Sequence, residues 1–98
     1  NPAWENASME QTLITLYGRP GCELCERTEL IVRRLVAEGG SRLTLSIVNI
    51  EEDPAVHARL LEQIPALEVA GALLPLAISP MQIAAHLRGA VGQADGER

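Results

Sequence analysis

The chain has 98 residues, of which 47% are hydrophobic, so it can form one small domain with a modest core. It contains no phenylalanine, one tyrosine and one tryptophan, which excludes an aromatic stacking surface for single-stranded nucleic acid. Thirteen acidic residues against eight arginines give a net charge of −5, which argues against nucleic acid or an anionic membrane as partner. No stretch of the sequence is apolar for long enough to span a bilayer.

The sequence divides into three parts. Residues 1–11 lack the basic start and apolar run of a signal peptide, and Met9 is a candidate native start, so we expect a flexible leader or tag remnant there. We expect residues 12–90 to form the folded domain. Residues 91–98 are polar and are expected to form a flexible tail.

The first predicted elements are a strand and a helix. Residues 12–17 are apolar and β-branched, which predicts a strand buried on both faces. Glycines and a proline in residues 18–21 predict a loop. From Cys22 onward, apolar residues recur at helical spacing, and the Gly39-Gly40 pair predicts the end of this helix.

Residues 43–50 predict a second strand from their β-branched and aliphatic composition. Asp53 before Pro54 predicts an N-cap and a first helical residue, with the helix running to about residue 62 and Leu60 and Leu61 facing inward. The Ile64-Pro65 pair breaks that helix.

Two short apolar runs, residues 66–70 and 73–78, predict a hairpin around Gly71-Ala72. Pro75 assigns the second run to the edge of the sheet. A third helix is predicted to begin at Ser79-Pro80 and to end at Gly89.

The predicted order is therefore β-α-β-α-β-β-α. A strand–helix–strand unit requires a right-handed parallel crossover, and the hairpin adds antiparallel strands. We expect an α/β fold with a four-stranded mixed sheet flanked by three helices, which cover both faces because three strands are apolar on both sides.

Cys22 and Cys25 are the only cysteines and lie where the first strand gives way to the first helix. The unpaired N–H groups and partial positive charge of a helix start favour a thiolate over a thiol. We therefore expect Cys22 to be a solvent-facing nucleophile and Cys25 to resolve the mixed disulfide that it forms.

The charges around Cys22 oppose each other. Glu23 disfavours the thiolate, while Arg19 and Arg27 offset part of that effect. We expect the pKa of Cys22 to lie moderately below the ordinary ~8.5, as in a reductant or electron carrier. On residue type alone, Arg19 is equally well a loop charge or a contact for a substrate carboxylate.

A C-x-x-C pair can also be half of a zinc site. The remaining nitrogen ligands are His57 and His86, which fall on predicted helices away from Cys22, so we expect them to be surface residues and expect no bound metal. The acidic run at residues 51–53 is expected to be a solvated helix start.

Four segments together resemble a known family. They are Leu-Tyr-Gly-Arg-Pro-Gly-Cys-Glu-Leu-Cys at residues 16–25, Asn-Ile-Glu-Glu-Asp-Pro at residues 49–54, Ile64-Pro65 before an apolar strand, and Ser79-Pro80. With the element order, they make residues 12–87 resemble the thioredoxin-like fold, and more narrowly the short C-x-x-C glutaredoxin-like proteins.

The resemblance implies a role for each motif. Cys22 would attack and Cys25 would resolve. Pro65, in cis, would lie across from the pair, and the backbone at Ile64 would bind an extended peptide or glutathione. Arg19 occupies the place of the basic residue that contacts a glutathione carboxylate in glutaredoxins.

The chain departs from the family at several positions. Glu23-Leu24 stands where glutaredoxins have Pro-Tyr and thioredoxins Gly-Pro. Residues 71–74 lack the glycine pair and following polar residue that bind glutathione, and Gln63 stands where glutaredoxins tend to have threonine. The sequence also offers no counterpart of the buried acid that thioredoxins place behind the resolving cysteine.

The sequence thus predicts a cytoplasmic, monomeric dithiol–disulfide oxidoreductase that serves cell redox homeostasis or electron transfer. Its partner is expected to be a disulfide-containing protein or a glutathione-type thiol, with no bound cofactor and glutathione as a candidate reductant. Two other classes stay open: a thioredoxin-like binding module with non-catalytic thiols, and a zinc-linked structural module.

Overall fold

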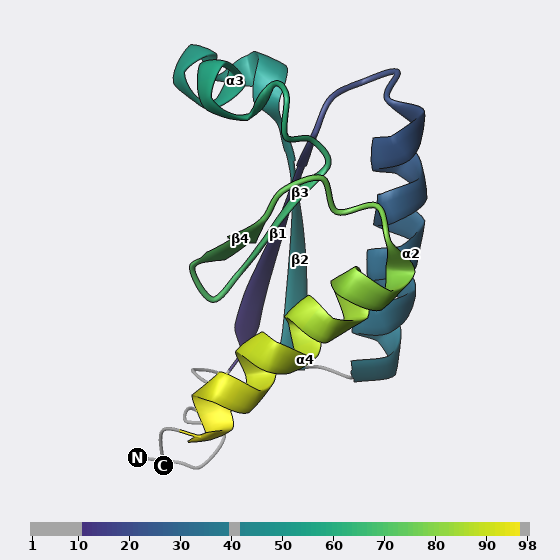
Figure 1. Cartoon of the computed structure of the whole chain (residues 1–98), viewed down its shortest axis with the longest axis vertical. Coiled ribbons are helices and arrows are strands. Elements are labelled where there is room, and N and C mark those ends of the chain that lie inside the picture. Colours follow the sequence, from purple (N-terminus) through teal and green to yellow (C-terminus); the bar gives the residue numbers. More distant parts are fainter. Residues whose placement is uncertain (1–10, 40–41, 97–98) are drawn as a thin grey trace.

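The computed structural model describes residues 11–39 and 42–96, which form a mixed sheet and its helices (Figure 1). The predicted leader, apart from its last residue, and residues 97–98 of the predicted tail lie outside the described residues. The four strands stand in the order β2-β1-β3-β4. They are β1 (Thr12–Gly18), β2 (Leu43–Asn49), β3 (Ala66–Val69) and β4 (Ala72–Leu74).

The mixed sheet predicted from the element order is confirmed. β1 and β2 run parallel, from the pair Thr12–Leu43 to the pair Gly18–Asn49. β3 is antiparallel to β1 and to β4. The helices that join or follow the strands are α2 (Glu23–Gly39), the 3-10 turn η2 (Ile50–Glu52), α3 (Pro54–Leu60) and α4 (Pro80–Gly96).

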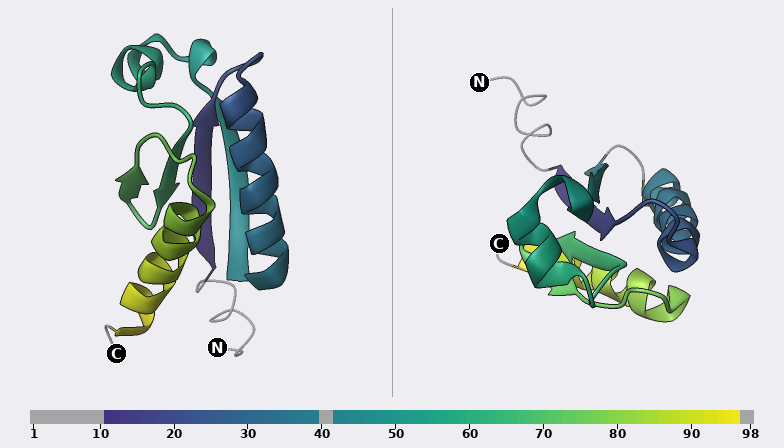
Figure 2. Two further views of the ribbon diagram at one scale, coloured as in Figure 1. Left: turned by 45° about the vertical axis from the view of Figure 1, so that its right-hand side comes forward. Right: turned by 90° about the horizontal axis from the view of Figure 1, so that it is seen from above.

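The hydrophobic core lies between one face of the sheet and the helices α2 and α4. Both helices contact the strands and each other, as Figure 2 shows from two directions. The buried members of this core come from β1, α2, β3, the loop before α4 and α4 itself: Ile14, Leu16, Val32, Leu67, Val69, Ala77, Ile83 and Leu87. Their aliphatic side chains supply the packing that a chain without phenylalanine needs.

Within residues 11–39 and 42–96, the opposite face of the sheet is covered at one end only. α3 packs on η2 at the carboxyl ends of β1 and β2 (Figure 1), where Ala66 is fully buried. Farther along this face, Leu13 is 57% exposed and Leu73 is 37% exposed. The prediction that β1 is buried on both faces is therefore wrong, because α3 has only seven residues and cannot reach along the strands.

Two helix ends differ from the prediction. α3 ends at Leu60 rather than near residue 62, and Leu61 is 43% exposed rather than inward, since the turn toward Pro65 has already begun. α4 continues past Gly89 to Gly96. A glycine stops a helix when it adopts a positive φ, and Gly89 does not, although Gly21 and Gly71 do.

Asp53 caps α3 as predicted, because its carboxylate accepts hydrogen bonds from the N–H groups of Ala55 and Val56. The hairpin is also confirmed, with Ala70 and Gly71 at its turn and positive φ at both residues. That combination matches the right-handed twist of the strands that it joins. β4 ends before Pro75 and forms an edge of the sheet, as predicted, although it is shorter than residues 73–78.

Candidate active site

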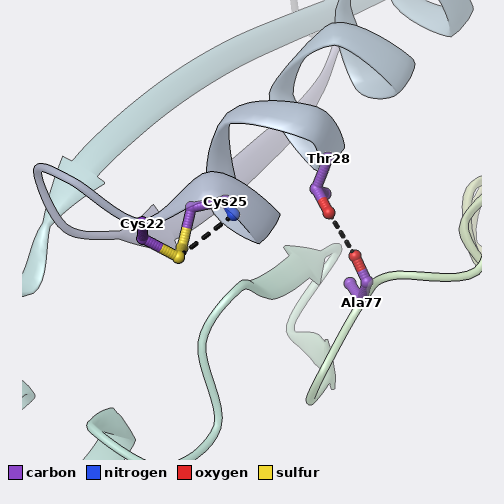
Figure 3. Close-up of a disulfide and its surroundings, with 4 residues drawn as sticks. All are labelled: Cys22, Cys25, Thr28 and Ala77. Carbon is purple, nitrogen blue, oxygen red and sulfur yellow. Dashed lines mark hydrogen bonds between the residues drawn. A yellow bond between two sulfur atoms is a disulfide. The ribbon is translucent and has the colours of Figure 1, made fainter.

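Cys22 and Cys25 form a disulfide at the N-terminus of α2, with Cα atoms 5.2 Å apart (Figure 3). The first helical hydrogen bond runs from the N–H of Glu26 to the carbonyl of Cys22, at 3.0 Å. The N–H of Cys25 donates to the sulfur of Cys22 at 3.1 Å. Cys22 is therefore the N-cap of α2, and its Sγ accepts the bond that a serine or aspartate oxygen accepts in other helices.

The two sulfur-bearing residues differ in access to solvent. Cys22 is partly exposed, whereas Cys25 is buried, with 7% of its surface accessible. A partner molecule therefore meets Cys22 first. The geometry thus separates an outer, accessible cysteine from an inner, buried one.

The glycine at the end of β1 makes room for Cys25. A Cβ on Gly18 would lie 3.0 Å from the Cβ of Cys25 and 3.1 Å from its Sγ. Both distances are shorter than van der Waals contact. Gly18 therefore allows the first turn of α2 to pack directly against the strand.

The charges around the disulfide are less compensated than the sequence predicts. Glu29 and Arg33, four residues apart on α2, form an ion pair with 2.8 Å between Arg33 Nε and Glu29 Oε2. Glu23 and Arg27, in contrast, form no ion pair within the described part of the chain. Both are exposed, so water screens the carboxylate beside Cys22.

The Ile64–Pro65 peptide bond is cis, as the family resemblance implies. Pro65 is fully buried and Ile64 is partly buried. Among the described residues, nothing pairs with the backbone N–H or C=O of Ile64. This backbone is free to pair with a bound molecule.

The segment after β4 joins the proline to α2. Ala77 donates from its N–H to the carbonyl of Pro65 at 2.7 Å, and its own carbonyl accepts from the buried Thr28 hydroxyl at 2.6 Å. Figure 3 shows this second bond one turn along α2 from the disulfide. The proline, Ala77 and the start of α2 therefore form one connected unit.

The segment that lies next to the cis-proline loop and Thr28 differs from the one compared with the glutathione-binding turn in the sequence. Residues 71–74 form the hairpin turn and β4, whereas residues 75–79 lie beside Pro65 and Thr28. Leu76 in this segment has φ 50°, a left-handed conformation that costs a residue with a Cβ about 1–2 kcal/mol. No pattern in the sequence marks Leu76, because a leucine is not expected in that conformation.

A cavity of about 290 Å³ opens on the other side of Cys25. Its lining includes Arg19, Cys25, Glu26, Glu29 and Asn49. Two of these lining residues are acidic, but Glu26 is exposed and the Glu29 carboxylate pairs with Arg33, so neither is a buried acid behind the resolving cysteine. The spacing of four residues between Cys25 and Glu29 could have found one of them, since it repeats a helical turn.

The other residues considered as ligands lie apart from the disulfide. His57 is on α3, and His86 is on α4 with its Nε2 2.9 Å from the carbonyl oxygen of Ala72. No group of three or more His, Cys, Asp or Glu in residues 11–39 and 42–96 is arranged to hold a metal ion. Residues 51 and 52 belong to the exposed turn η2. Arg19 is exposed at the rim of the cavity behind Cys25.

Comparisons with known proteins identify the family and the fold of this chain. The model of the glutaredoxin-like domain (DUF836) matches residues 13–88. This chain belongs to that glutaredoxin-like family. No match was found among the curated proteins.

Solved structures share the architecture. A structural-genomics target protein from X. campestris is 25% identical, with a TM-score of 0.64 over 78% of this chain and 96% of that one. The germline-specific thioredoxin Deadhead from Drosophila melanogaster is 12% identical, with a TM-score of 0.69 over 89% of this chain and 87% of that one. A malarial protein is 13% identical, with a TM-score of 0.65 over 81% and 96%.

The fold is thus thioredoxin-like, with the order β-α-β-α-β-β-α that the sequence predicts. The family and the Cys22–Cys25 pair support a redox type of role. In the described part of the chain, every helix is too short or too polar to cross a membrane.

Proposed function

We propose that the protein is a dithiol–disulfide oxidoreductase that reduces or exchanges disulfides of proteins or small molecules through Cys22 and Cys25. The observation that carries this proposal is the position of the Cys22 sulfur as N-cap acceptor of α2, with Cys25 buried behind it. A helix N-terminus stabilises negative charge, and a charge-assisted bond from the Cys25 N–H adds to that effect once the pair is reduced.

The proposed reaction has two exchange steps. The Cys22 thiolate attacks one sulfur of the substrate disulfide, a Cys22–substrate bond forms, and the other substrate sulfur leaves as a thiolate that water protonates. The Cys25 thiolate then attacks the Cys22 sulfur and releases the second substrate thiol. The substrate gains two electrons and two protons, and the protein ends as the Cys22–Cys25 disulfide that the structure contains.

Several finer features belong to the same proposal. A thiol such as glutathione would reduce the disulfide again, with no bound cofactor. Arg19 would contact a carboxylate of the partner, and Ile64 and Pro65 would supply the surface on which the partner lies. A reductant of this kind works in a reducing compartment, so we propose a cytoplasmic location and a role in redox homeostasis or electron transfer.

Replacing each cysteine in turn by serine tests which of the two attacks the substrate and which resolves the mixed disulfide. We expect Cys25→Ser to accumulate a mixed disulfide between Cys22 and a substrate such as glutathione disulfide, because the resolving thiol is gone. Cys22→Ser is expected to lose reduction of the same substrate and to form little mixed disulfide, since Cys25 is buried. Mass spectrometry of the unreduced products measures both. Equal trapping in the two variants would contradict the assignment.

A further inference from the structure

Leu76 is an exposed apolar residue in a backbone conformation that a leucine rarely adopts. Its φ is 50° and 53% of its surface is exposed, so burial in the core does not explain a leucine there. Ala70 is the other described residue with a Cβ and a positive φ, and it belongs to a hairpin turn that requires this value. Leu76 lies outside every helix and strand, and glycine or asparagine would fit its backbone better.

The hydrogen bonds of this segment connect Leu76 and its neighbour Ala77 to the cis-proline loop and to the helix that follows the disulfide. The N–H of Leu76 donates to the carbonyl of Gln63 at 2.9 Å, and the next residue, Ala77, bonds to both Pro65 and Thr28. Figure 3 shows Ala77 opposite Thr28, on the first turns of the helix that carries the cysteines. Leu76 is therefore fixed within one residue of the contact that joins the proline to α2.

Exposed apolar residues also lie next to Ala77 in sequence and between the two cysteines. Ile78, on the other side of Ala77, is 45% exposed, and Leu24, between the two cysteines, is 47% exposed. Residues 75–80 contain no charged side chain. A strained backbone in the segment that connects the cis-proline to the cysteine-bearing helix is typical of a binding site.

A substrate must bring its own sulfur to Cys22, so the residues that flank that sulfur must lie close to Cys22. The unpaired N–H and C=O of Ile64 can form hydrogen bonds to the backbone of an extended substrate, which would then lie like an added β-strand. Apolar side chains beside the substrate cysteine would then meet Leu76, Ile78 and Leu24.

We propose that the substrate is an extended polypeptide that carries an apolar residue next to its reactive cysteine, and that Leu76 contacts this residue. The inference rests on the proposed function and names its substrate class. The reaction is the two-step exchange described above, in which the reduced Cys22–Cys25 pair passes two electrons to the polypeptide disulfide.

Two matched peptides test this preference. Each is a short synthetic peptide dimerised through its single cysteine, with leucine beside the cysteine in one and serine in the other. Pre-reduced protein is mixed with each peptide, and the second-order rate constant of a single turnover is measured. We expect the leucine peptide to react about tenfold faster, and Leu76→Ala to lower this ratio at least about fivefold by removing apolar contact area.

The variant Leu76→Gly distinguishes the effect of the Leu76 side-chain contact from the effect of its strained backbone. It should lower the ratio as Leu76→Ala does, but it should also raise the urea concentration at the midpoint of unfolding, because glycine adopts a positive φ freely. Leu13→Ala is the matched control: Leu13 is exposed to a similar degree, but lies at the far end of β1, and this variant should keep the ratio of the parent protein.

The outcomes distinguish this inference from the proposed function. If the parent protein reduces both peptides at the same rate, or if Leu76→Ala slows both equally, the substrate preference is overturned while the oxidoreductase activity stands. If the parent protein reduces neither peptide nor glutathione disulfide, the proposed function fails and the preference fails with it.

Discussion

The residue that most directly controls the geometry of the disulfide is a glycine. Gly18 has no Cβ, and one placed there would lie 3.1 Å from the sulfur of Cys25. In the disulfide this sulfur is held by its bond to Cys22, whereas in the dithiol it can rotate away. An added methyl group would lie 3.0 Å from the Cys25 Cβ in either redox state, but the fixed sulfur of the disulfide adds a second close contact, so the methyl group crowds the oxidised form more than the reduced form.

We predict that Gly18→Ala makes the disulfide easier to reduce. A preferential destabilisation of about 1.4 kcal/mol would raise the reduction potential by about 30 mV. Equilibration with glutathione redox buffers, read by mass spectrometry, measures the shift. Gly89→Ala is a matched control, because no atom lies within 4 Å of the added Cβ and the potential should not change. An unchanged potential in Gly18→Ala would show that Gly18 does not act on the sulfur.

Tyr17 is the only tyrosine, and its titration is visible without labels. Burial, and then the hydrogen bond and negative charge of Glu68, raise the pKa of Tyr17 above its ordinary 10.0, against a weaker opposite effect of Arg59. Its hydroxyl donates to Glu68 Oε1 at 2.8 Å. The folded state thus favours the neutral phenol.

The direction of the pH effect follows from that preference. Because the pKa is higher in the folded than in the unfolded chain, the contribution of Tyr17 to stability is complete below pH 10 and is lost as pH rises through the folded pKa. We predict that Glu68→Gln lowers the pKa of Tyr17, measured by tyrosinate absorbance. A titration curve identical to that of the parent protein would exclude Glu68 as a cause.

At the scale of elements, one buried hydroxyl connects α2 to the segment before α4. Thr28 is 1% exposed, and its Oγ1 donates to the Ala77 carbonyl at 2.6 Å. We predict that Thr28→Val, which keeps the volume but leaves this carbonyl unpaired, lowers the free energy of unfolding by about 1–3 kcal/mol. Urea unfolding measures the loss. Thr28→Ser retains the hydroxyl, so a loss as large as that of Thr28→Val would show that the hydrogen bond is not the cause.

The elements that the sequence predicts well are those with a local physical signal. Asp53 before Pro54 marks the start of α3, and Gly71 within a short apolar run marks the hairpin. The ends of α3 and α4 are predicted poorly, because a glycine such as Gly89 stops a helix only when its surroundings favour a positive φ. The local sequence does not contain that information.

At the scale of the whole molecule, the element order predicts the mixed sheet, and the resemblance of four segments implies the thioredoxin-like fold. The C-x-x-C spacing predicts only that the two cysteines are close enough to form the disulfide that the structure contains. The rest of the site depends on contacts between distant segments. Thr28 and Ala77 are 49 residues apart in sequence, and no periodicity links them. The sequence also predicts two apolar faces for the sheet, but the short α3 leaves Leu13 exposed. Tertiary packing decides both features.

The proposed exchange chemistry requires Cys22 to be the ionised, accessible thiol of the reduced pair. The most direct measurement is the rate of alkylation of each cysteine in fully reduced protein as a function of pH, resolved by mass spectrometry. We predict that Cys22 reacts faster than Cys25 at neutral pH and keeps this advantage as pH falls, because the N-terminus of α2 favours its thiolate. Slow and equal alkylation of the two cysteines near pH 6 would contradict the account and would favour a binding module with non-catalytic thiols.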